Sequence, residues 1–254
     1  MESAVKKQCN QRLKICSYNP ACPDIGFCRI PCHAQLPHSL APSLHYNLGV
    51  SYGELGRWRE ATEAYKQAIR IKPDYADAHN NLGVAYSKLG RYQEAIEAFR
   101  QAIKIKTDYA EAHYNLGTTY GKLGRSQEAI DEYKQTIKIK PDYAGAHFNL
   151  GIVYGTLGRY QEAVESYKQA IRIKPDYTEN YNLGVNYYKL GRYQDAIEAY
   201  KQAIRIKPDF ADVHYTLGVA YLVTGDKESA LEEYKILKTL DAEQASKLFN
   251  LIYK

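Results

Sequence analysis

Two groups of residues in this sequence have types and spacings that could carry chemistry. The first is a cysteine cluster near the start of the chain, whose thiols could bind a metal or take part in redox reactions. The second is a row of asparagines, whose amides could hydrogen-bond an extended peptide backbone. The cluster comprises Cys9, Cys16, Cys22, Cys28, Cys32 and the adjacent His33, and the row comprises Asn47, Asn81, Asn115, Asn149 and Asn182.

The cysteine spacings match no standard ligand pattern. Six, five, five and three residues separate consecutive cysteines, whereas zinc and iron–sulfur sites need chelate loops of set lengths. Cys28, Cys32 and His33 approach the haem-attachment pattern but have one residue too many between the cysteines. We therefore expect no cofactor and interpret residues 1–41 as a poorly ordered Cys- and Pro-rich segment. A metal- or redox-binding adaptor built on this cluster is the alternative.

Charge and hydropathy argue against several kinds of partner. The chain has 254 residues and a formal net charge of +5, of which residues 1–40 contribute +3. The nearly balanced remainder lacks the basic footprint of a nucleic-acid-binding protein. No apolar run approaches the roughly 18 to 20 residues of a membrane span, and no secretory signal is visible, so we expect no membrane partner. An odd number of cysteines fits a reducing compartment, which predicts a cytoplasmic location.

The asparagines belong to a repeat that fills the chain after residue 41. A Leu-Gly pair recurs at steps of 34, 34, 34, 33 and 34 residues, and a second glycine follows each pair after seven residues. Alanines and aromatic residues recur at fixed offsets within the same period. This periodicity predicts six repeats within residues 42–244. Their ranges are about 42–75, 76–109, 110–143, 144–177, 178–210 and 211–244.

Each repeat is predicted to form two helices. In the second repeat, Asp74 and Asp77 indicate a capping-box-like start of the first helix, and Gly90 indicates a left-handed end. The small Gly83 on the first helix and Ala95 on the second would let the two axes approach closely, with aromatic side chains filling the margins.

The fifth repeat is one residue short, between residues 176 and 182. A deletion inside a helix would rotate everything after it by about 100°. We therefore expect the turn or the first helical turn to absorb the loss.

This pattern resembles the tetratricopeptide repeat family. Seven family positions occur in order in the first repeat, whereas histidines stand where the family has tryptophan. The resemblance implies an all-α fold, a right-handed α-α superhelix of antiparallel helix pairs whose first helices line a concave groove. We expect residues 242–254 to cap its end, because their apolar residues recur at helical spacing. The family positions are Leu48, Gly49, Tyr52, Ala61, Tyr65, Ala68 and Pro73, the histidines are His45, His79, His113, His147 and His214, and the cap residues are Ala245, Leu248, Phe249 and Ile252.

The asparagine row resembles the asparagine ladder in the repeat segment of protein O-GlcNAc transferases, which bind extended peptides through such amides. The resemblance implies a non-catalytic scaffold that binds a protein or peptide partner in the groove. The alternatives are that the asparagines link adjacent repeats or were copied with the repeat unit. Aromatic and aliphatic neighbours are expected to line the groove, with apolar bulk towards its C-terminal end. These neighbours are Tyr46, Tyr114, Phe148, Tyr181, Tyr215, Tyr188 and Leu222.

Other functions have less support in the sequence. A clamp for the C-terminal carboxylate of a chaperone needs lysine four residues before the groove asparagine, but Asp77, Glu111 and Asp212 occupy such positions and would repel a carboxylate. We find no phosphate-binding loop or nucleophile elbow, so we do not expect an enzyme. An accessory subunit of a glycosyltransferase or another complex is an alternative. The repeated histidines lie too far apart to share a metal ion and are predicted to be structural.

Overall fold

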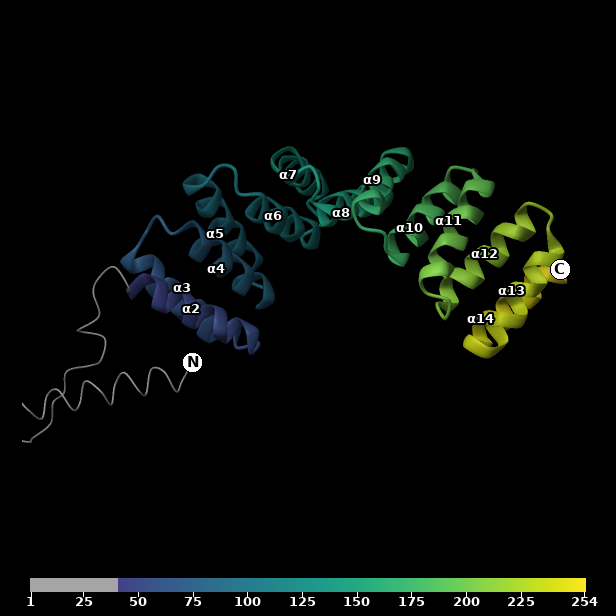
Figure 1. The fold of residues 1–254 in the computed structure, drawn as a ribbon, viewed down its shortest axis with the longest axis horizontal. Helices are drawn as coiled ribbons and strands as arrows, with labels where there is room; N and C mark the ends of the chain where they lie inside the picture. Colours follow the sequence, from purple (N-terminus) through teal and green to yellow (C-terminus); the bar gives the residue numbers. More distant parts are fainter. Residues whose placement is uncertain (1–40) are drawn as a thin grey trace, which may run out of the picture. The chain divides into compact units, whose positions relative to one another are not determined.

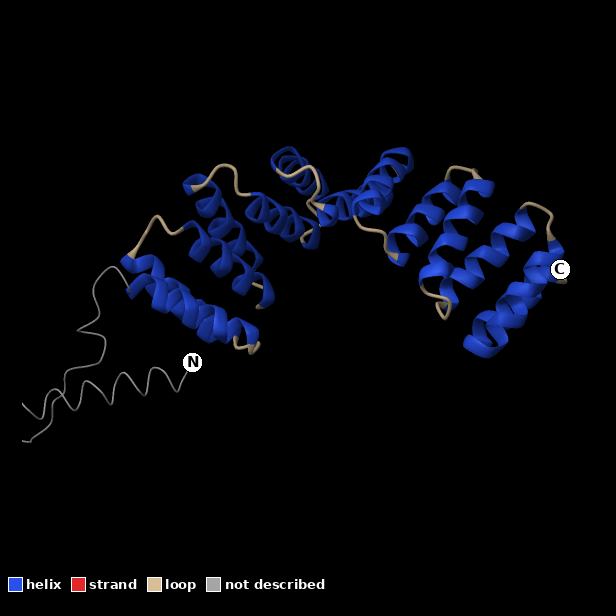
Figure 2. Cartoon of the chain, viewed as in Figure 1, coloured by secondary structure: helices blue, strands red, loops and turns tan. Residues whose placement is uncertain are grey.

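Helices follow one another through residues 41–254, the part of the chain that this computed structural model describes. No strand occurs among these residues, and short loops join the helices (Figure 2). The cysteine cluster lies outside the described residues, as does nearly all of the segment predicted to be poorly ordered. Cys9, Cys16, Cys22, Cys28, Cys32 and His33 are therefore not placed.

The helices form six pairs and one additional helix, in chain order (Figure 1). Each first helix packs against the second helix of its own repeat and of the repeat before it, which makes an all-α solenoid of helix pairs. The first helices are α2 (Ala41–Glu54), α4 (Ala76–Lys88), α6 (Ala110–Lys122), α8 (Ala144–Thr156), α10 (Tyr177–Lys189) and α12 (Ala211–Val223). The second helices are α3 (Trp58–Ile71), α5 (Tyr92–Ile105), α7 (Ser126–Ile139), α9 (Tyr160–Ile173), α11 (Tyr193–Ile206) and α13 (Lys227–Leu240).

The two glycines of each repeat have different structural roles. The second one adopts a positive φ, 75° at Gly90, and so ends the first helix in the predicted left-handed conformation. In repeats 1 to 5 the first one lies under an aromatic ring, and a Cβ on Gly83, for example, would stand 2.6 Å from the ring of Phe99. Phe99 is 1% exposed and lies at the centre of the core. The prediction that aromatic side chains fill only the margins of the helix contact was therefore wrong for this ring.

The predicted capping box of the second repeat does not form. Helix α4 begins after Tyr75, with no side-chain hydrogen bond at its N-cap. Asp77 instead accepts a hydrogen bond of 2.7 Å from the hydroxyl of Tyr109, the residue directly before α6. The carboxylate at this position therefore joins the start of α4 to the start of α6.

The shortened fifth repeat keeps a first helix of full length. Helix α10 has 13 residues, as α4 does. The missing residue comes from the preceding loop, as expected, and the N-cap becomes Asp176, whose side chain accepts from the backbone N–H of Thr178 at 2.9 Å. The deletion therefore leaves the positions within α10 in register.

Helix α14 (Ala242–Ile252) covers the C-terminal end of the solenoid and packs on α12 and α13. Three of its four predicted core residues are buried, namely Ala245, Leu248 and Ile252, whereas Phe249 is 41% exposed. Leu248 lies over Gly218, the position that an aromatic ring of the same repeat covers in the five other repeats. The cap thus completes the core of repeat 6.

Candidate interaction face on the first helices

The first helices bring the predicted groove residues to one side of the solenoid. Helix α2 contacts α4 directly, α4 contacts α6, α6 contacts α8, and α8 contacts α10. Successive second helices make no contact of similar extent among residues 41–254. The first helices of neighbouring repeats therefore lie closer together than their second helices do. We call the side of these helices that carries the asparagine row the first-helix face.

Three asparagines of the row hydrogen-bond to the preceding repeat. The side-chain amide of Asn81 donates to the Tyr46 hydroxyl at 3.1 Å, and that of Asn149 donates to the Tyr114 hydroxyl at 3.1 Å. The amide of Asn115 donates to Oδ1 of Asn80 at 3.1 Å, which is 35 residues earlier like the other two acceptors. These bonds connect repeats, as one of the alternatives for the row expects.

The bonds at the N-terminal end join into a chain, which we call the asparagine relay. Asn115 donates to Asn80, Asn80 donates to Oδ1 of Asn81 at 3.2 Å, and Asn81 donates to Tyr46. Asn80 is 6% exposed, so its amide needs these partners. This role of Asn80 was not predicted from the sequence, although its 35-residue separation from Asn115 was a usable signal. The relay connects α2, α4 and α6.

Asn47 and Asn182 differ from the other members of the row. Neither makes a side-chain hydrogen bond with any described residue, and Asn47 is exposed while Asn182 is half-buried. Asn47 has no described repeat before it. For Asn182, the residue in the place of Tyr46 and Tyr114 is Phe148, whose ring has no hydroxyl to accept a bond. The amide of Asn182 therefore keeps its donors and its acceptor available.

The aromatic residues predicted to neighbour the asparagine row are half-buried and pack against the edge of the core. The ring of Tyr46 lies 5.9 Å from that of Tyr65 and 5.0 Å from that of Tyr75, measured between centroids. Tyr114, Phe148 and Tyr181 make equivalent contacts with aromatic residues of their own second helices. Burial raises the pKa of Tyr46 and that of Tyr181. These side chains are therefore neutral and present only part of their surface to a ligand.

Apolar side chains gather on the first-helix face of repeats 4 to 6. Ile152 is 40% exposed, and the ring of Tyr188 lies edge-on to Tyr193 with centroids 5.1 Å apart. Tyr215 and Leu222 are half-buried against the core. We call the set Ile152, Tyr181, Val185, Tyr188, Tyr215, Val219 and Leu222 the apolar end of the face.

Comparison with known proteins agrees with the helix pairs and their 34-residue spacing. Family profiles described as TPR repeat match residues 51–90 and 184–225, and profiles described as tetratricopeptide repeat match residues 74–142 and 144–177. The chain belongs to the tetratricopeptide-repeat family. No curated protein matches the sequence.

Several solved structures share the fold. A crystal structure of MamA protein is 27% identical, with a TM-score of 0.62, and the match covers 67% of this chain and 93% of that one. PilF of Pseudomonas aeruginosa is 21% identical, with a TM-score of 0.70 over 84% of this chain and 98% of that one. YrrB, titled a TPR protein with an unusual peptide-binding site, is 21% identical, with a TM-score of 0.67 over 74% and 99%. Proteins of this fold are typically scaffolds for protein–protein interaction.

Three of the histidines that replace the family tryptophan, His79, His147 and His214, tie their first helices to the preceding loops. Nε2 of His79 lies 2.9 Å from the carbonyl oxygen of Pro73, and Nε2 of His147 lies 2.9 Å from that of Pro141. In repeat 5 Asn180 replaces the histidine, and its amide donates to the backbone oxygen of Asp176 at 2.8 Å. These contacts agree with the predicted structural role. Among residues 41–254, no group of three or more His, Cys, Asp or Glu side chains is arranged to hold a metal ion.

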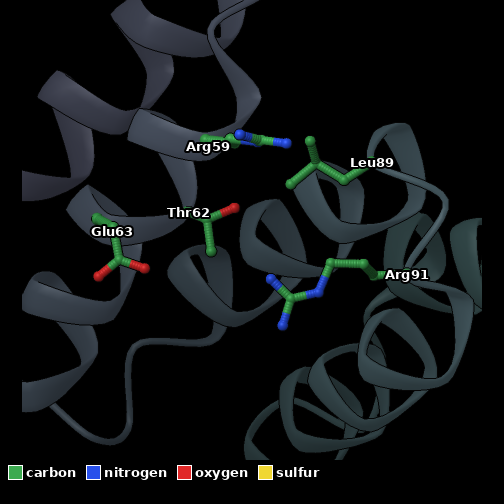
Figure 3. A pocket seen from close by; sticks show the side chains of 5 residues that line it. All are labelled: Arg59, Thr62, Glu63, Leu89 and Arg91. Carbon is green, nitrogen blue, oxygen red and sulfur yellow. The ribbon is translucent and has the colours of Figure 1, made fainter.

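Two surface cavities lie away from the predicted groove residues. One has a volume of about 430 Å³, and Figure 3 shows its lining of Arg59, Thr62 and Glu63 from α3 with Leu89 and Arg91 from the turn after α4. Arg91 is already paired with Glu94 and stacks on the Tyr86 ring at 4.6 Å. The other cavity lies between α13 and α14.

None of the helices within residues 41–254 has both the length and the apolar character that a membrane span requires.

Proposed function

We propose that this tetratricopeptide-repeat protein binds an extended segment of a protein partner on its first-helix face. The observation that carries the proposal is the combination, on one side of the solenoid, of a row of amides with an apolar end. An amide can donate to and accept from a peptide backbone without reading its side chains. The likeness to the repeat segment of O-GlcNAc transferases is part of the proposal and rests on the asparagine spacing alone.

The individual amides differ in what they can offer to a ligand. Asn81 uses one N–H and one of the two lone pairs of its Oδ1 within the asparagine relay, so it has the least capacity left for a ligand. Asn115 and Asn149 each use one N–H and keep the other N–H and their Oδ1. Asn182 uses none of these groups within the described residues, which makes it the strongest candidate for a paired hydrogen bond to a peptide unit.

The apolar end determines the class of segment that we expect. Of the first-helix residues around Asn182, Tyr181, Val185 and Tyr188 are uncharged and partly exposed. A charged ligand side chain placed there would lose its water without gaining a partner, at a cost of several kcal/mol if fully buried. We infer that the bound segment has large apolar side chains on both sides of the peptide unit that meets Asn182.

The remaining elements of the proposal concern chemistry and location. We propose a scaffold without catalytic activity, since the polar side chains that recur in the repeats have structural or binding roles. Its partner is a protein or peptide, and neither a nucleic acid nor a chaperone C-terminal carboxylate is expected. A cytoplasmic location is also proposed and rests on the odd number of cysteines.

Selection from a displayed random peptide library, followed by titration calorimetry with the selected peptides and the full chain, tests the proposal. We expect extended peptides with large apolar residues to be selected. Tyr188→Ala or Leu222→Ala should weaken binding by about tenfold each, since each removes roughly 1.4 kcal/mol or more of apolar contact. The exposed Tyr253, on the capping helix, provides a control in Tyr253→Ala. Equal binding by all four proteins would contradict the proposal.

A further inference from the structure

Both ring nitrogens of His214 in repeat 6 face hydrogen-bond acceptors. Nδ1 lies 2.6 Å from Oε2 of Glu233 on α13, and Nε2 lies 2.8 Å from the carbonyl oxygen of Pro208 in the loop before α12. A backbone carbonyl only accepts, so Nε2 must carry a proton. A carboxylate oxygen at 2.6 Å from Nδ1 requires a second proton between the two atoms. The pair therefore holds one proton more than a neutral imidazole next to a carboxylate.

The other repeats contain each half of this arrangement alone. His79 and His147 make the carbonyl contact, but Ala98 and Ser166 stand at the position of Glu233. A neutral ring satisfies that single contact by donating from Nε2.

Repeat 3 contains the complementary half. Nδ1 of His113 lies 2.6 Å from Oε2 of Glu132, and the loop before it has Thr107 in place of proline. No carbonyl contact to Nε2 is found for His113 among the described residues. A neutral ring can therefore donate from Nδ1 and leave Nε2 unprotonated.

The surroundings of His214 contribute few other charges. Its side chain is 3% exposed, and within residues 41–254 Glu233 is the charged group that acts on it. Lys207, in the same loop as Pro208, lies over the ring of Phe210 at 5.2 Å. Asp212 accepts a hydrogen bond of 2.6 Å from Gln244 of α14. Burial lowers the pKa of His214, but the hydrogen bonds to Glu233 and to the Pro208 carbonyl outweigh it, and the net pKa is raised.

We propose that His214 and Glu233 form a proton-dependent clasp that joins α12 to α13 and to the loop before α12. A neutral ring has one N–H for two acceptors, so loss of the additional proton leaves two lone pairs facing each other at either Nδ1 or Nε2, and one of the two contacts must open. Because α14 packs on both α12 and α13, the clasp also supports the capping helix. The stabilisation is complete below the unfolded-state pKa of about 6.5 and disappears as the pH rises through the raised folded-state pKa.

Thermal unfolding of the full chain between about pH 5.5 and about pH 8.5, the range in which histidine titrates, tests the clasp. As the pH rises across this range, the Tm of wild type should fall by about 2 to 4 °C more than the Tm of Glu233→Gln does. In Glu233→Gln the amide N–H can donate to an unprotonated Nδ1, so this variant should be less stable than wild type at acidic pH and at least as stable at alkaline pH. Parallel Tm profiles of the two proteins overturn the proposal.

The matched control is Glu132→Gln, which changes the same contact in repeat 3. It should change the pH dependence of the Tm less than Glu233→Gln does, because a neutral His113 ring can donate to Glu132 without leaving a second ring contact unmet. A second readout is the NMR titration of the His214 imidazole, whose pKa should be lower in Glu233→Gln than in wild type. An unchanged titration, or an equal loss of pH dependence in Glu132→Gln, contradicts the clasp.

Discussion

The first-helix face has two regions that use the same repeat positions differently. In repeats 2 to 4 the asparagines bond to the preceding repeat, to Tyr46, Asn80 and Tyr114. In repeats 5 and 6 Asn182 has no such partner, Thr216 replaces the next asparagine, and the surrounding side chains are apolar. The amides of the N-terminal region therefore help to join repeats, whereas the Asn182 amide makes no side-chain hydrogen bond with the described residues and is, in our proposal, available to a ligand.

The packing of the core also differs between the N-terminal and C-terminal regions. Rings from the same repeat cover the Leu-Gly glycines of repeats 1 to 5, but Leu248 of α14 covers Gly218. Repeat 6 therefore depends on a helix outside the repeat, on the contact of His214 with Glu233, and on the bond from Gln244 to Asp212. We expect the C-terminal region to unfold more readily than the N-terminal one.

The largest effect should follow from Leu248→Ala. Leu248 is fully buried, so the substitution removes apolar contact and leaves a cavity over Gly218, at a cost of about 2 to 5 kcal/mol. Hydrogen exchange should show the loss of protection in α12 to α14 and little change in α2 to α7. Leu251→Ala is the control, because Leu251 is 40% exposed on the same helix. A uniform loss of protection along the chain would contradict the difference between the two regions.

The two kinds of asparagine should respond differently to alanine. Asn81→Ala breaks two bonds of the asparagine relay and leaves the buried Asn80 amide without an acceptor, which costs about 1 to 3 kcal/mol. Asn182→Ala removes no side-chain bond, so its stability should stay within about 0.5 kcal/mol of wild type. Denaturant unfolding measures both, and peptide binding should be lost in Asn182→Ala alone. Similar destabilisation by both substitutions would show that Asn182 is structural.

The sequence was sufficient for the repeats and insufficient for the hydrogen bonds between them. Periodicity located the helix pairs and the turn glycines such as Gly90, because steric requirements of a backbone recur with the repeat. It could not show that Asp77 bonds to Tyr109 instead of capping its own helix, since both partners are plausible from spacing. Nor did it separate Asn81 from Asn182, because spacing alone does not show that Tyr46 faces Asn81 and that Phe148 takes the equivalent place before Asn182. Nor could spacing show that the cap residue Phe249 stays 41% exposed while its ring contacts Tyr234 of α13 and Tyr253.

A single hydroxyl should convert Asn182 to the N-terminal type. Phe148 occupies the position from which Tyr46 and Tyr114 accept the amide of the next repeat. Phe148→Tyr should therefore allow Asn182 to donate, with a gain of about 0.5 to 1.5 kcal/mol in the free energy of unfolding. Peptide binding should weaken at the same time, because the amide is then engaged. The double variant Phe148→Tyr with Asn182→Ala is the control, and an equal gain in that protein would show that the hydroxyl acts through another partner.

The smallest effect concerns two glycines at the same position of first helices α6 and α8. A Cβ on Gly121 would approach nothing closer than the Tyr133 hydroxyl at 3.9 Å, whereas one on Gly155 would stand 3.1 Å from Oδ1 of Asn186 on α10. Gly121→Ala should stabilise the chain by about 0.4 to 1 kcal/mol through the lower entropy of the unfolded chain. Gly155→Ala should lose that gain, because Asn186 is 6% exposed and its amide also donates to the backbone oxygen of Asn182 at 2.8 Å. Denaturant unfolding measures both effects. Equal stabilisation by both substitutions would show that Asn186 can move away from the added methyl group without a loss in the free energy of unfolding.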